Sequence, residues 1–552
     1  MTSPKPVAGK GAFQDSGVVK SVASMDWNPT GSWKYLEPFY EDWFAPCSHA
    51  CPAGNDIVTW LRFVEEGRYQ EAARSLLNFN PFPATLGCVC PHPCETPCNR
   101  KALGGAIAIQ SVERFLGEYA IEHDVMPELE TSGSGRVVIA GAGPAALSAA
   151  YFLRLRGYDV TVLDRPAGPQ TGLLSIPAFR LPRRIVEAEY DRLRRIGIKF
   201  EESGPDAPRA PFSLNGHSAG LVANLAEPET EAIEGLHHPA VLDLVRLLDM
   251  TRHGSGLPSG RRLAIAGSRN DALDLARSLV REGHEVTVFC RDAKADASFS
   301  KEDLALAAEE GVRVEFLTAV CRILFDGDRL QGLICARTRN VAGPVYGRAP
   351  IRIVGTEFTF EVDHLVTSLP SPKNGSPFVD ASTGLAPVFE CPDSLDSASL
   401  GSAVSNGRKV AAEIHAHLSG AAQPAMTPVE LRGVGEEIAK FKDFNEAYFR
   451  IDPGPSRMWR DRGERLRDFD DVRLTLSEPA IRREGSRCFK CGTCTLCGNC
   501  ELFCPDNSIV LATDGSRYEI RQQYCKGCMV CVEECPRAAI HSRRAGVSVE
   551  TR

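Results

Sequence analysis

The sequence predicts a multidomain protein in which two cysteine-rich regions flank two α/β units. Ten cysteines lie between positions 488 and 535, and six more lie between positions 47 and 98. Between these regions, two short apolar runs, 137–140 and 263–266, are each followed at once by a glycine-containing turn and a helical pattern. A chain of 552 residues has room for about three or four such domains.

The C-terminal cysteines have the spacing of a bacterial ferredoxin. Two runs of the form C-x2-C-x2-C-x3-C-P begin at Cys494 and Cys525. In such paired runs the fourth cysteine binds the cluster of the other run, so we predict two [4Fe–4S] clusters in a ferredoxin-like α+β domain. Their ligand sets are Cys494, Cys497, Cys500 and Cys535, and Cys525, Cys528, Cys531 and Cys504.

Other interpretations of these cysteines explain less. A disulfide scaffold or a zinc ribbon would not require two identical runs. Two cysteines, Cys488 and Cys491, are left over, and they are either spare ligands or buried thiols.

The N-terminal cysteines lie among short helical patterns. Amphipathic helices are predicted near 56–66, 69–77 and 109–119. Two proline-flanked groups of cysteines surround these helices, which favours a metal cluster over structural thiols. The six cysteines are Cys47, Cys51, Cys88, Cys90, Cys94 and Cys98.

The first α/β unit carries a dinucleotide-binding fingerprint, G-A-G-P-A-A from position 141, between a strand and a helix. Gly141 allows the tight turn, Gly143 lets the backbone approach a pyrophosphate, and Ala146 permits close helix–strand packing. The helix N-terminus favours the phosphate charge. The residues predicted to contact the dinucleotide are Gly141, Gly143, Pro144, Ala146 and Asp164, which ends the next strand.

The second α/β unit has an altered turn, G-S-R-N-D-A from position 267. Gly267 and Ala272 match the fingerprint, but Arg269 replaces the middle glycine and either blocks a nucleotide or offers it a cation. The next strand ends with Arg291 rather than an acid, which would suit the 2′-phosphate of NADP. The alternative is a Rossmann unit that no longer binds a nucleotide.

Composition and charge exclude several classes. The net charge is −8, and the basic stretch 457–467 is interleaved with acids, which argues against nucleic-acid binding. The chain has no apolar run long enough to span a membrane, and its first residues lack the pattern of a signal peptide. Metal ligation by thiols suits a reducing compartment, so we expect a cytoplasmic protein.

The order of these regions resembles the small subunit of bacterial NADPH-dependent glutamate synthase and the related front half of dihydropyrimidine dehydrogenase, with a ferredoxin appended. The resemblance covers roughly residues 45 to 540. The matching motifs are Cys51-Pro52-Ala53-Gly54, Asn78-Phe79-Asn80-Pro81-Phe82-Pro83, Val89-Cys90-Pro91 with Cys94-Glu95 and Cys98, Gly141-Ala142-Gly143-Pro144-Ala145, Gly172-Leu173-Leu174, Ile176-Pro177-Ala178-Phe179-Arg180-Leu181-Pro182 and Gly407-Arg408-Lys409-Val410-Ala411-Ala412.

The resemblance implies a helical iron–sulfur domain and a FAD domain into which an NADPH-type domain is inserted. It implies FAD contacts from Leu173, Arg180 and the turn at Asp393, besides the fingerprint. An upstream C-x2-C pair of the family is absent here, so we expect one N-terminal cluster. The resemblance places its ligands at Cys51, Cys90 and Cys94, with the fourth from Glu113, Cys98 or Cys47.

The expected domains follow from these assignments. They are a flexible lead (1–40), a helical iron–sulfur domain (41–128), a FAD domain (129–205 and 380–418), an NAD(P)-type domain (206–379), a linker (419–485) and a ferredoxin-like domain (486–552).

The function implied is electron transfer. NAD(P)H would reduce FAD, and the clusters would pass single electrons to a ferredoxin or a partner redox enzyme, with no catalytic acid–base pair. The alternative is an electron-transfer subunit with a degenerate nicotinamide site. The chain would form a hetero-complex or a homodimer.

Overall fold

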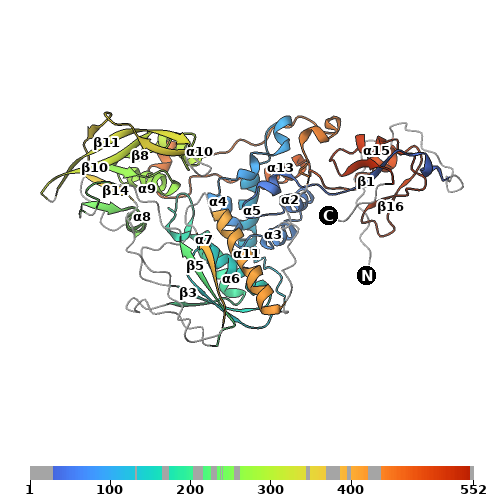
Figure 1. Cartoon of the computed structure of the whole chain (residues 1–552), viewed down its shortest axis with the longest axis horizontal. Coiled ribbons are helices and arrows are strands. Elements are labelled where there is room, and N and C mark those ends of the chain that lie inside the picture. The colour runs from blue at the N-terminus through green and yellow to red at the C-terminus, as the bar shows by residue number, and fades with distance from the viewer. Residues whose placement is uncertain are drawn as a thin grey trace.

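The computed structural model describes residues 29–130, 133–164, 173–202, 216–225, 233–236, 238, 240–253, 261–327, 329–342, 348–367, 386–393, 400–420 and 437–546. The regions are arranged along the long axis of the molecule (Figure 1). A sheet-rich unit lies at one end, another α/β unit and a helical region lie in the middle, and a small C-terminal unit lies at the other end. Within the described residues, no helix is both long and apolar enough to cross a bilayer.

Short helices and turns form the helical region. Helix α2 begins after Asp56, whose carboxylate accepts from the Thr59 N–H, and ends at the left-handed Gly67. Helices α4 and α5 cross closely, since a Cβ on Gly117 would lie 2.2 Å from the Ala84 nitrogen. The elements are η1 (Thr30–Trp33), α1 (Pro46–Ala50), α2 (Ile57–Glu66), α3 (Tyr69–Leu77), α4 (Pro83–Val89), η2 (Pro93–Glu95), η3 (Asn99–Leu103) and α5 (Ile109–Glu122).

The first α/β unit is built on a parallel sheet in the order β15–β5–β2–β3–β4. Its strands and helices are β2 (Arg136–Ala140), α6 (Pro144–Leu155), β3 (Asp159–Asp164), η4 (Leu173–Ser175), α7 (Arg183–Arg195), β4 (Lys199–Glu202), β5 (Ala219–Leu225), β15 (Val388–Asp393) and α11 (Leu400–Ser419). Strand β5 falls in the range expected for the second unit, but it pairs with β2. The first sheet therefore extends past the expected boundary at 206.

Two glycines explain how closely the elements of this unit pack. Gly407 lets α11 lie against α6, because a Cβ there would lie 2.2 Å from the Ala145 carbonyl oxygen. The Ser148 hydroxyl fixes the same contact by donating to the Val404 carbonyl. Gly401, at the start of α11, lies against Pro52 of the helical region.

The second α/β unit has a parallel sheet in the order β6–β14–β7–β8–β9 and an antiparallel sheet in which β11 pairs with β10, β12 and β13. Its elements are β6 (Val241–Asp243), α8 (Leu244–His253), β7 (Arg262–Ala266), α9 (Asn270–Arg281), β8 (Glu285–Cys290), α10 (Lys301–Glu310), β9 (Arg313–Phe316), β10 (Thr318–Asp326), β11 (Arg329–Ala342), β12 (Arg348–Arg352), β13 (Phe358–Phe360) and β14 (His364–Thr367). In the order of the chain, these strands come between β5 and β15 of the first sheet.

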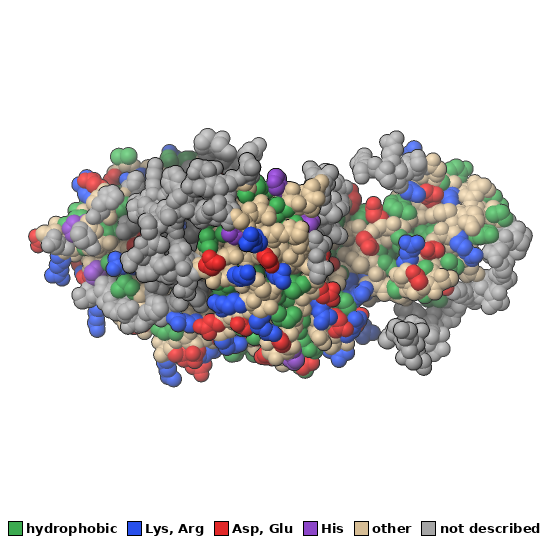
Figure 2. All heavy atoms as spheres, turned by 90° about the horizontal axis from the view of Figure 1, so that it is seen from below, with side chains coloured by type: hydrophobic (Ala, Val, Ile, Leu, Met, Phe, Trp, Pro, Cys, Tyr) green, Lys and Arg blue, Asp and Glu red, His purple; other side chains and the backbone are tan. Residues whose placement is uncertain are grey.

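The described part of the expected linker is packed against its neighbours. It contains η7 (Phe441–Asp443), η8 (Glu446–Tyr448), α12 (Arg462–Arg465) and α13 (Glu478–Arg487). Ile438 bridges to Phe44, and the Val472 N–H donates to the Phe179 carbonyl. Basic and acidic side chains are intermingled over the face shown in Figure 2, in keeping with the mixed charge of the sequence.

A strand from the N-terminal part of the chain pairs with a strand of the C-terminal unit. It contains α14 (Asn499–Leu502), β16 (Ile509–Leu511), β17 (Tyr518–Ile520), α15 (Val530–Glu533) and β18 (Ile540–Arg544), and β18 pairs antiparallel with β1 (Leu36–Tyr40). The expectation of a flexible lead over 1–40 is therefore wrong for residues 36–40, because backbone pairing with β18 orders them. Residues 1–28 lie outside the described part.

Candidate cofactor sites

The first set of C-terminal cysteines, Cys494, Cys497, Cys500 and Cys535, lines one pocket. Three of them come from α14 and the loop before it, whereas Cys535 follows α15. Helices α14 and α15 pack together, so both runs contribute to the pocket. The fold thus brings together the crossed set predicted from the spacing.

The second set, Cys525, Cys528, Cys531 and Cys504, is also in close proximity. Burial, and then the neighbouring Cys525, Cys528 and Cys504, raise the pKa of the Cys531 thiol to about 12. Such a thiol stays protonated on its own, and bound iron supplies the positive charge that favours the thiolate. Among the described residues, no three His, Cys, Asp or Glu side chains converge tightly enough for a single metal ion.

Backbone N–H groups near these thiols donate hydrogen bonds to the sulfur atoms. The Ser508 and Ala539 N–H groups donate to Sγ of Cys504 and Cys535, at 3.3 and 3.4 Å. In each case the preceding residue, Asn507 or Ala538, has a left-handed conformation with φ of 47° or 55°. Because N–H donors stabilise a thiolate, this chemistry fits iron–sulfur ligation.

Tyr40 on β1 donates a hydrogen bond to Sγ of Cys500 at 3.2 Å. Hydrogen bonds to ligand sulfurs favour the more negative, reduced cluster. We expect Tyr40→Phe to lower the reduction potential of this cluster, on the order of tens of millivolts, with iron content unchanged. An EPR-monitored redox titration measures the shift, with Tyr35→Phe, whose side chain is 90% exposed, as the control. An unchanged potential in Tyr40→Phe would contradict this role.

In the helical region, Cys51, Cys90, Cys94 and Glu113 are neighbours. Burial, and then the neighbouring Cys51, Glu113 and Cys90, raise the pKa of Cys94 well above its ordinary value. The His92 N–H donates to Sγ of Cys90 at 3.4 Å, and His92 is itself left-handed with φ of 48°, as are Leu496 and Gly527 two residues after Cys494 and Cys525. This set fits a cluster with one carboxylate ligand.

Three polar side chains hold Glu113 in place. It is 4% exposed, and its carboxylate accepts from Nδ2 of Asn55 at 2.9 Å and Nδ2 of Asn80 at 3.0 Å and contacts Nε2 of His92 at 2.7 Å. Sequence reasoning did not assign roles to these three residues. The only available signal was the position of Asn80 within a motif shared with the family. Cys47 and Cys98, the other candidates for the fourth ligand, line a pocket together with Cys488 and Cys491, and its lining does not include Cys51, Cys90 or Cys94.

The turn of the first α/β unit closes around Asp393. Gly141 adopts a φ of +112°, and a Cβ on Gly143 would lie 2.2 Å from the Asp393 Oδ2 atom. The Asp393 carboxylate accepts from the N–H groups of Ala145 at 2.9 Å and Ala146 at 3.4 Å, in the first turn of α6. The turn therefore has the glycines and the helix N-terminus of a dinucleotide-binding fingerprint, with the Asp393 carboxylate at the start of the helix.

The other predicted FAD contacts are placed as follows. Leu173 is buried at the start of η4. Asp164 ends β3, and its side chain lies outside the described part. The buried guanidinium of Arg180 pairs with Asp274 at 2.7 Å and Asp303 at 2.9 Å, both from the second unit. These ion pairs join the two α/β units, and the contact of Arg180 with FAD stays a prediction.

Two arginines of the second α/β unit lie at the carboxyl ends of neighbouring strands. Arg269 follows β7 and Arg291 follows β8, and these neighbouring strands run parallel. The guanidinium of Arg269 lies 3.4 Å from Asp271, and its Nε atom is buried without a hydrogen-bond partner among the described residues. A Cβ on Gly267 would lie 3.2 Å from that of Ala272, so the turn is tight. This donor set fits a phosphate.

Three family models match the chain. The model of the dihydropyrimidine dehydrogenase domain II with a 4Fe-4S cluster matches residues 43–125. The model of the NAD(P)-binding Rossmann-like domain matches residues 139–173, which is the first of the two fingerprints. The model of the 4Fe-4S binding domain matches residues 518–541.

Several relatives with known names are similar to long stretches of this chain. The small chain of NADPH glutamate synthase from Azospirillum brasilense is 31% identical over 58% of this chain and 72% of its own. The beta subunit of the NADPH-Fe(3+) oxidoreductase from Geobacter sulfurreducens is 29% identical over 60% of this chain and 51% of its own. The beta subunit of the NADP(+)-dependent formate dehydrogenase from Moorella thermoacetica is 27% identical over 81% of this chain and 70% of its own. The chain thus spans about half the length of the Geobacter relative.

Cluster-binding domains at both ends, with a dinucleotide-binding Rossmann unit between them, define an iron–sulfur protein of the oxidoreductase class. Within that class the chain belongs to the family of the glutamate synthase small chain.

Proposed function

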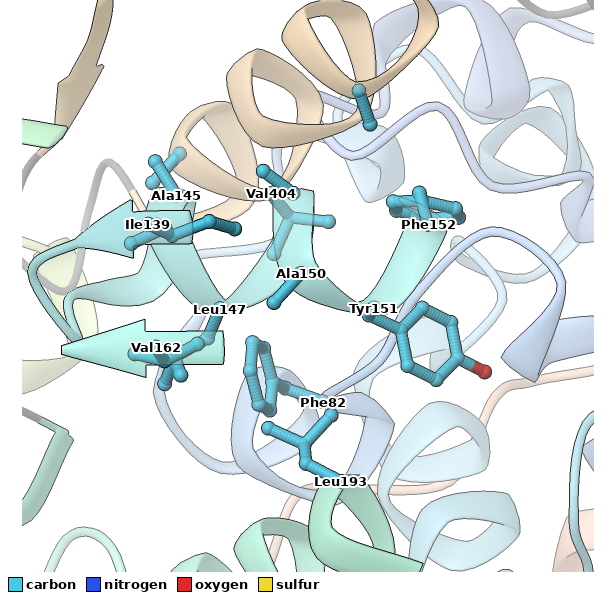
Figure 3. Packing of buried hydrophobic residues seen from close by; sticks show 14 of the residues in the cluster. Phe82, Ile139, Ala145, Leu147, Ala150, Tyr151, Phe152, Val162, Leu193 and Val404 are labelled. Atoms are coloured by element: carbon cyan, nitrogen blue, oxygen red, sulfur yellow. The ribbon is translucent and has the colours of Figure 1, made fainter. Parts of the chain in front are cut away.

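We propose that this protein carries electrons between NAD(P)H, FAD and [4Fe–4S] clusters, and on to a ferredoxin or a partner redox enzyme. The observation that carries the proposal is a single hydrophobic core shared by the first α/β unit and the Cys90 region. Phe82, Val89 and Cys90 belong to the same buried cluster as β2 and α6. In Figure 3, Phe82 lies beside Leu147 of α6, Val162 of β3 and Leu193 of α7. A cluster at Cys90 and a flavin at α6 would therefore belong to one rigid body.

In this proposal Gly141, Gly143 and the N-terminus of α6 hold the pyrophosphate of FAD, and Asp393 orients the cofactor. When bound, FAD accepts a hydride and releases electrons singly. It can therefore couple the two-electron oxidation of NAD(P)H to the one-electron reduction of the clusters. The buried core around Phe82 excludes water from the contact between the two sites. Cys51, Cys90, Cys94 and Glu113 hold the nearer cluster, and the two C-terminal sets hold the clusters that face a partner.

The second α/β unit is proposed as the nicotinamide domain, inserted between β5 and β15 of the flavin domain. Arg269 and Arg291 lie at the carboxyl edge of its sheet, where such folds bind phosphates. The orphan Nε of Arg269 supports binding. The pairing of Arg269 with Asp271 supports the alternative, an electron-transfer subunit whose second unit is only a scaffold. The partner subunits and a cytoplasmic location remain parts of this proposal.

Anaerobic reductive titration tests the proposal. We expect NADPH to bleach the flavin absorbance and then the cluster absorbance of the full-length protein. Arg291→Ala should raise the NADPH concentration needed for half-reduction about tenfold by removing a 2′-phosphate contact. The matched control is Arg261→Ala, at the opposite edge of the same sheet. Bleaching by dithionite alone would favour the scaffold alternative, and a preparation without flavin would overturn the proposal.

A further inference from the structure

Four cysteines from opposite ends of the chain line one pocket in the helical region. Cys47 and Cys98 come from α1 and the start of η3, and Cys488 and Cys491 follow α13. Cys47, Cys488 and Cys491 are each less than 9% exposed.

The segment Cys488-Phe489-Lys490-Cys491 repeats the backbone of the ferredoxin-type motifs. Lys490, just before the second cysteine, is left-handed with φ of 53°, and its N–H donates to Sγ of Cys488 at 3.4 Å. Leu496 and Gly527 occupy the same position in the two C-terminal runs, with φ of 56° and 73°. Their N–H groups likewise offset the effect of burial, which raises the pKa of Cys494 and Cys525. A pair of merely buried thiols would not require this conformation.

Buried ion pairs hold this segment against the helical region. The guanidinium of Arg487, at the end of α13, pairs with Glu484 at 2.7 Å and donates to the carbonyls of Gly104 and Gly105. Glu484 in turn accepts from the Ala108 N–H at 2.7 Å, at the start of α5. These contacts place Cys488 next to the loop that begins at Cys98.

Other groups around the thiols suit a negatively charged occupant. Nδ2 of Asn99 lies 3.5 Å from Sγ of Cys491 as a donor. The guanidinium of Arg100 lies 4.8 Å from the centre of the Phe489 ring, within the same pocket lining. All four cysteines line this one pocket, so their thiols lie close to one another.

We propose that Cys47, Cys98, Cys488 and Cys491 hold a fourth [4Fe–4S] cluster, built jointly by the helical region and the C-terminal segment. This proposal replaces the expectation of a single cluster in the helical region. Only Gly492 and Thr493 separate Cys491 from Cys494, the first ligand of the next set. The fourth cluster would therefore stand between the flavin side of the molecule and the C-terminal pair. This proposal rests on the proposed function only in that both require the protein to hold iron–sulfur clusters.

Iron and acid-labile sulfide measured per chain test the proposal on anaerobically purified protein. Four clusters give about 16 iron and about 16 sulfide per chain. We expect Cys488→Ala/Cys491→Ala and Cys47→Ala/Cys98→Ala each to lose about four of both, together with one EPR signal of the reduced protein. The quadruple variant should lose no more than either pair, because all four residues serve one cluster. Cys88→Ala is the control, since Cys88 is buried in the same region but lies outside the pocket lining.

Flavin content and the EPR signals of the other clusters report whether a variant has folded. If a double variant loses the flavin and these signals, the single substitution Cys488→Ser replaces it in the test. Serine keeps a weaker oxygen ligand, so Cys488→Ser should shift or broaden one EPR signal only. About 12 iron in the wild type, unchanged in Cys488→Ala/Cys491→Ala, would overturn the fourth cluster and leave the proposed function standing. A colourless wild type would overturn both.

Discussion

Replacing Asp393 with alanine should strip most of the flavin from the protein. The carboxylate accepts hydrogen bonds from the Ala145 and Ala146 N–H groups, so it fixes the first turn of α6 against the end of β15. Hydrogen bonds to a charged group contribute about 1.5 to 3 kcal/mol, so we expect FAD to bind about 10 to 100-fold more weakly. The measurement is flavin released per chain after gel filtration, with a Kd from fluorescence quenching.

Two further variants separate flavin binding from capping of the helix. Asp393→Asn keeps an acceptor for the Ala145 N–H, so it should preserve α6 while still weakening FAD. Glu390→Ala changes an exposed carboxylate on the same strand and should leave flavin content unaltered. Full flavin content in Asp393→Ala would show that Asp393 is only a helix cap. The loss of iron along with flavin would instead indicate collapse of the shared core.

Local patterns predicted most of the helices and strands because neighbouring residues determine them. The helices expected near 56–66 and 69–77 correspond to α2 and α3, and both strand–turn–helix units are present at the expected positions. The pairing of β1 with β18 could not be predicted, because backbone hydrogen bonds between residues 36–40 and 540–544 leave no local signature. The same reason explains why the segment that packs through α13 was predicted only as a linker.

The cofactor sites could likewise be predicted where the signal is local in sequence, and not where it depends on how distant segments pack. The crossed sets of the C-terminal unit followed from spacing, because two identical runs fold on each other. Cys488 and Cys491 could not be joined to Cys47 and Cys98 in advance, since nothing in their local sequence indicates where α13 docks. The motif around Arg180 predicted a contact with FAD, but it could not predict the ion pairs with Asp274 and Asp303, two acids on helices of the other unit.

A buried cluster of charged side chains on α9 and α10 forms part of the contact between the second α/β unit and α12 of the linker. Glu310 is 1% exposed, and its carboxylate pairs with Arg277 at 2.8 Å, Arg281 at 2.9 Å and Arg465 of α12 at 3.2 Å. Both α9 arginines also lie over the ring of Phe179, at 4.7 and 4.0 Å. Three cations therefore share the Glu310 carboxylate. Arg277 also pairs with Asp303 and Arg465 with Glu309, but removal of Glu310 would leave the buried cluster with an excess of positive charge.

We expect Glu310→Gln to destabilise the α9–α10 region by about 3 to 5 kcal/mol, the cost of breaking a buried ion pair from one side. Native-state hydrogen exchange, read by mass spectrometry on α10, should speed up by more than about 100-fold. Glu309→Gln is the control, because Glu309 is 58% exposed and pairs with Arg465 alone among these arginines, so its loss should cost less than about 1 kcal/mol.

The effect of acid gives a second check on Glu310. Burial raises the pKa of this carboxyl, but Arg277 and Arg281 outweigh burial and hold the pKa below its ordinary value of 4.5. The stabilisation is therefore complete above pH 4.5 and is lost as the pH falls through the lower, folded-state pKa. Protection of α10 in the wild type should fall over that range, whereas Glu310→Gln should lack this component of the pH dependence. Equal exchange in Glu310→Gln and Glu309→Gln at neutral pH would show that the buried cluster does not stabilise the contact.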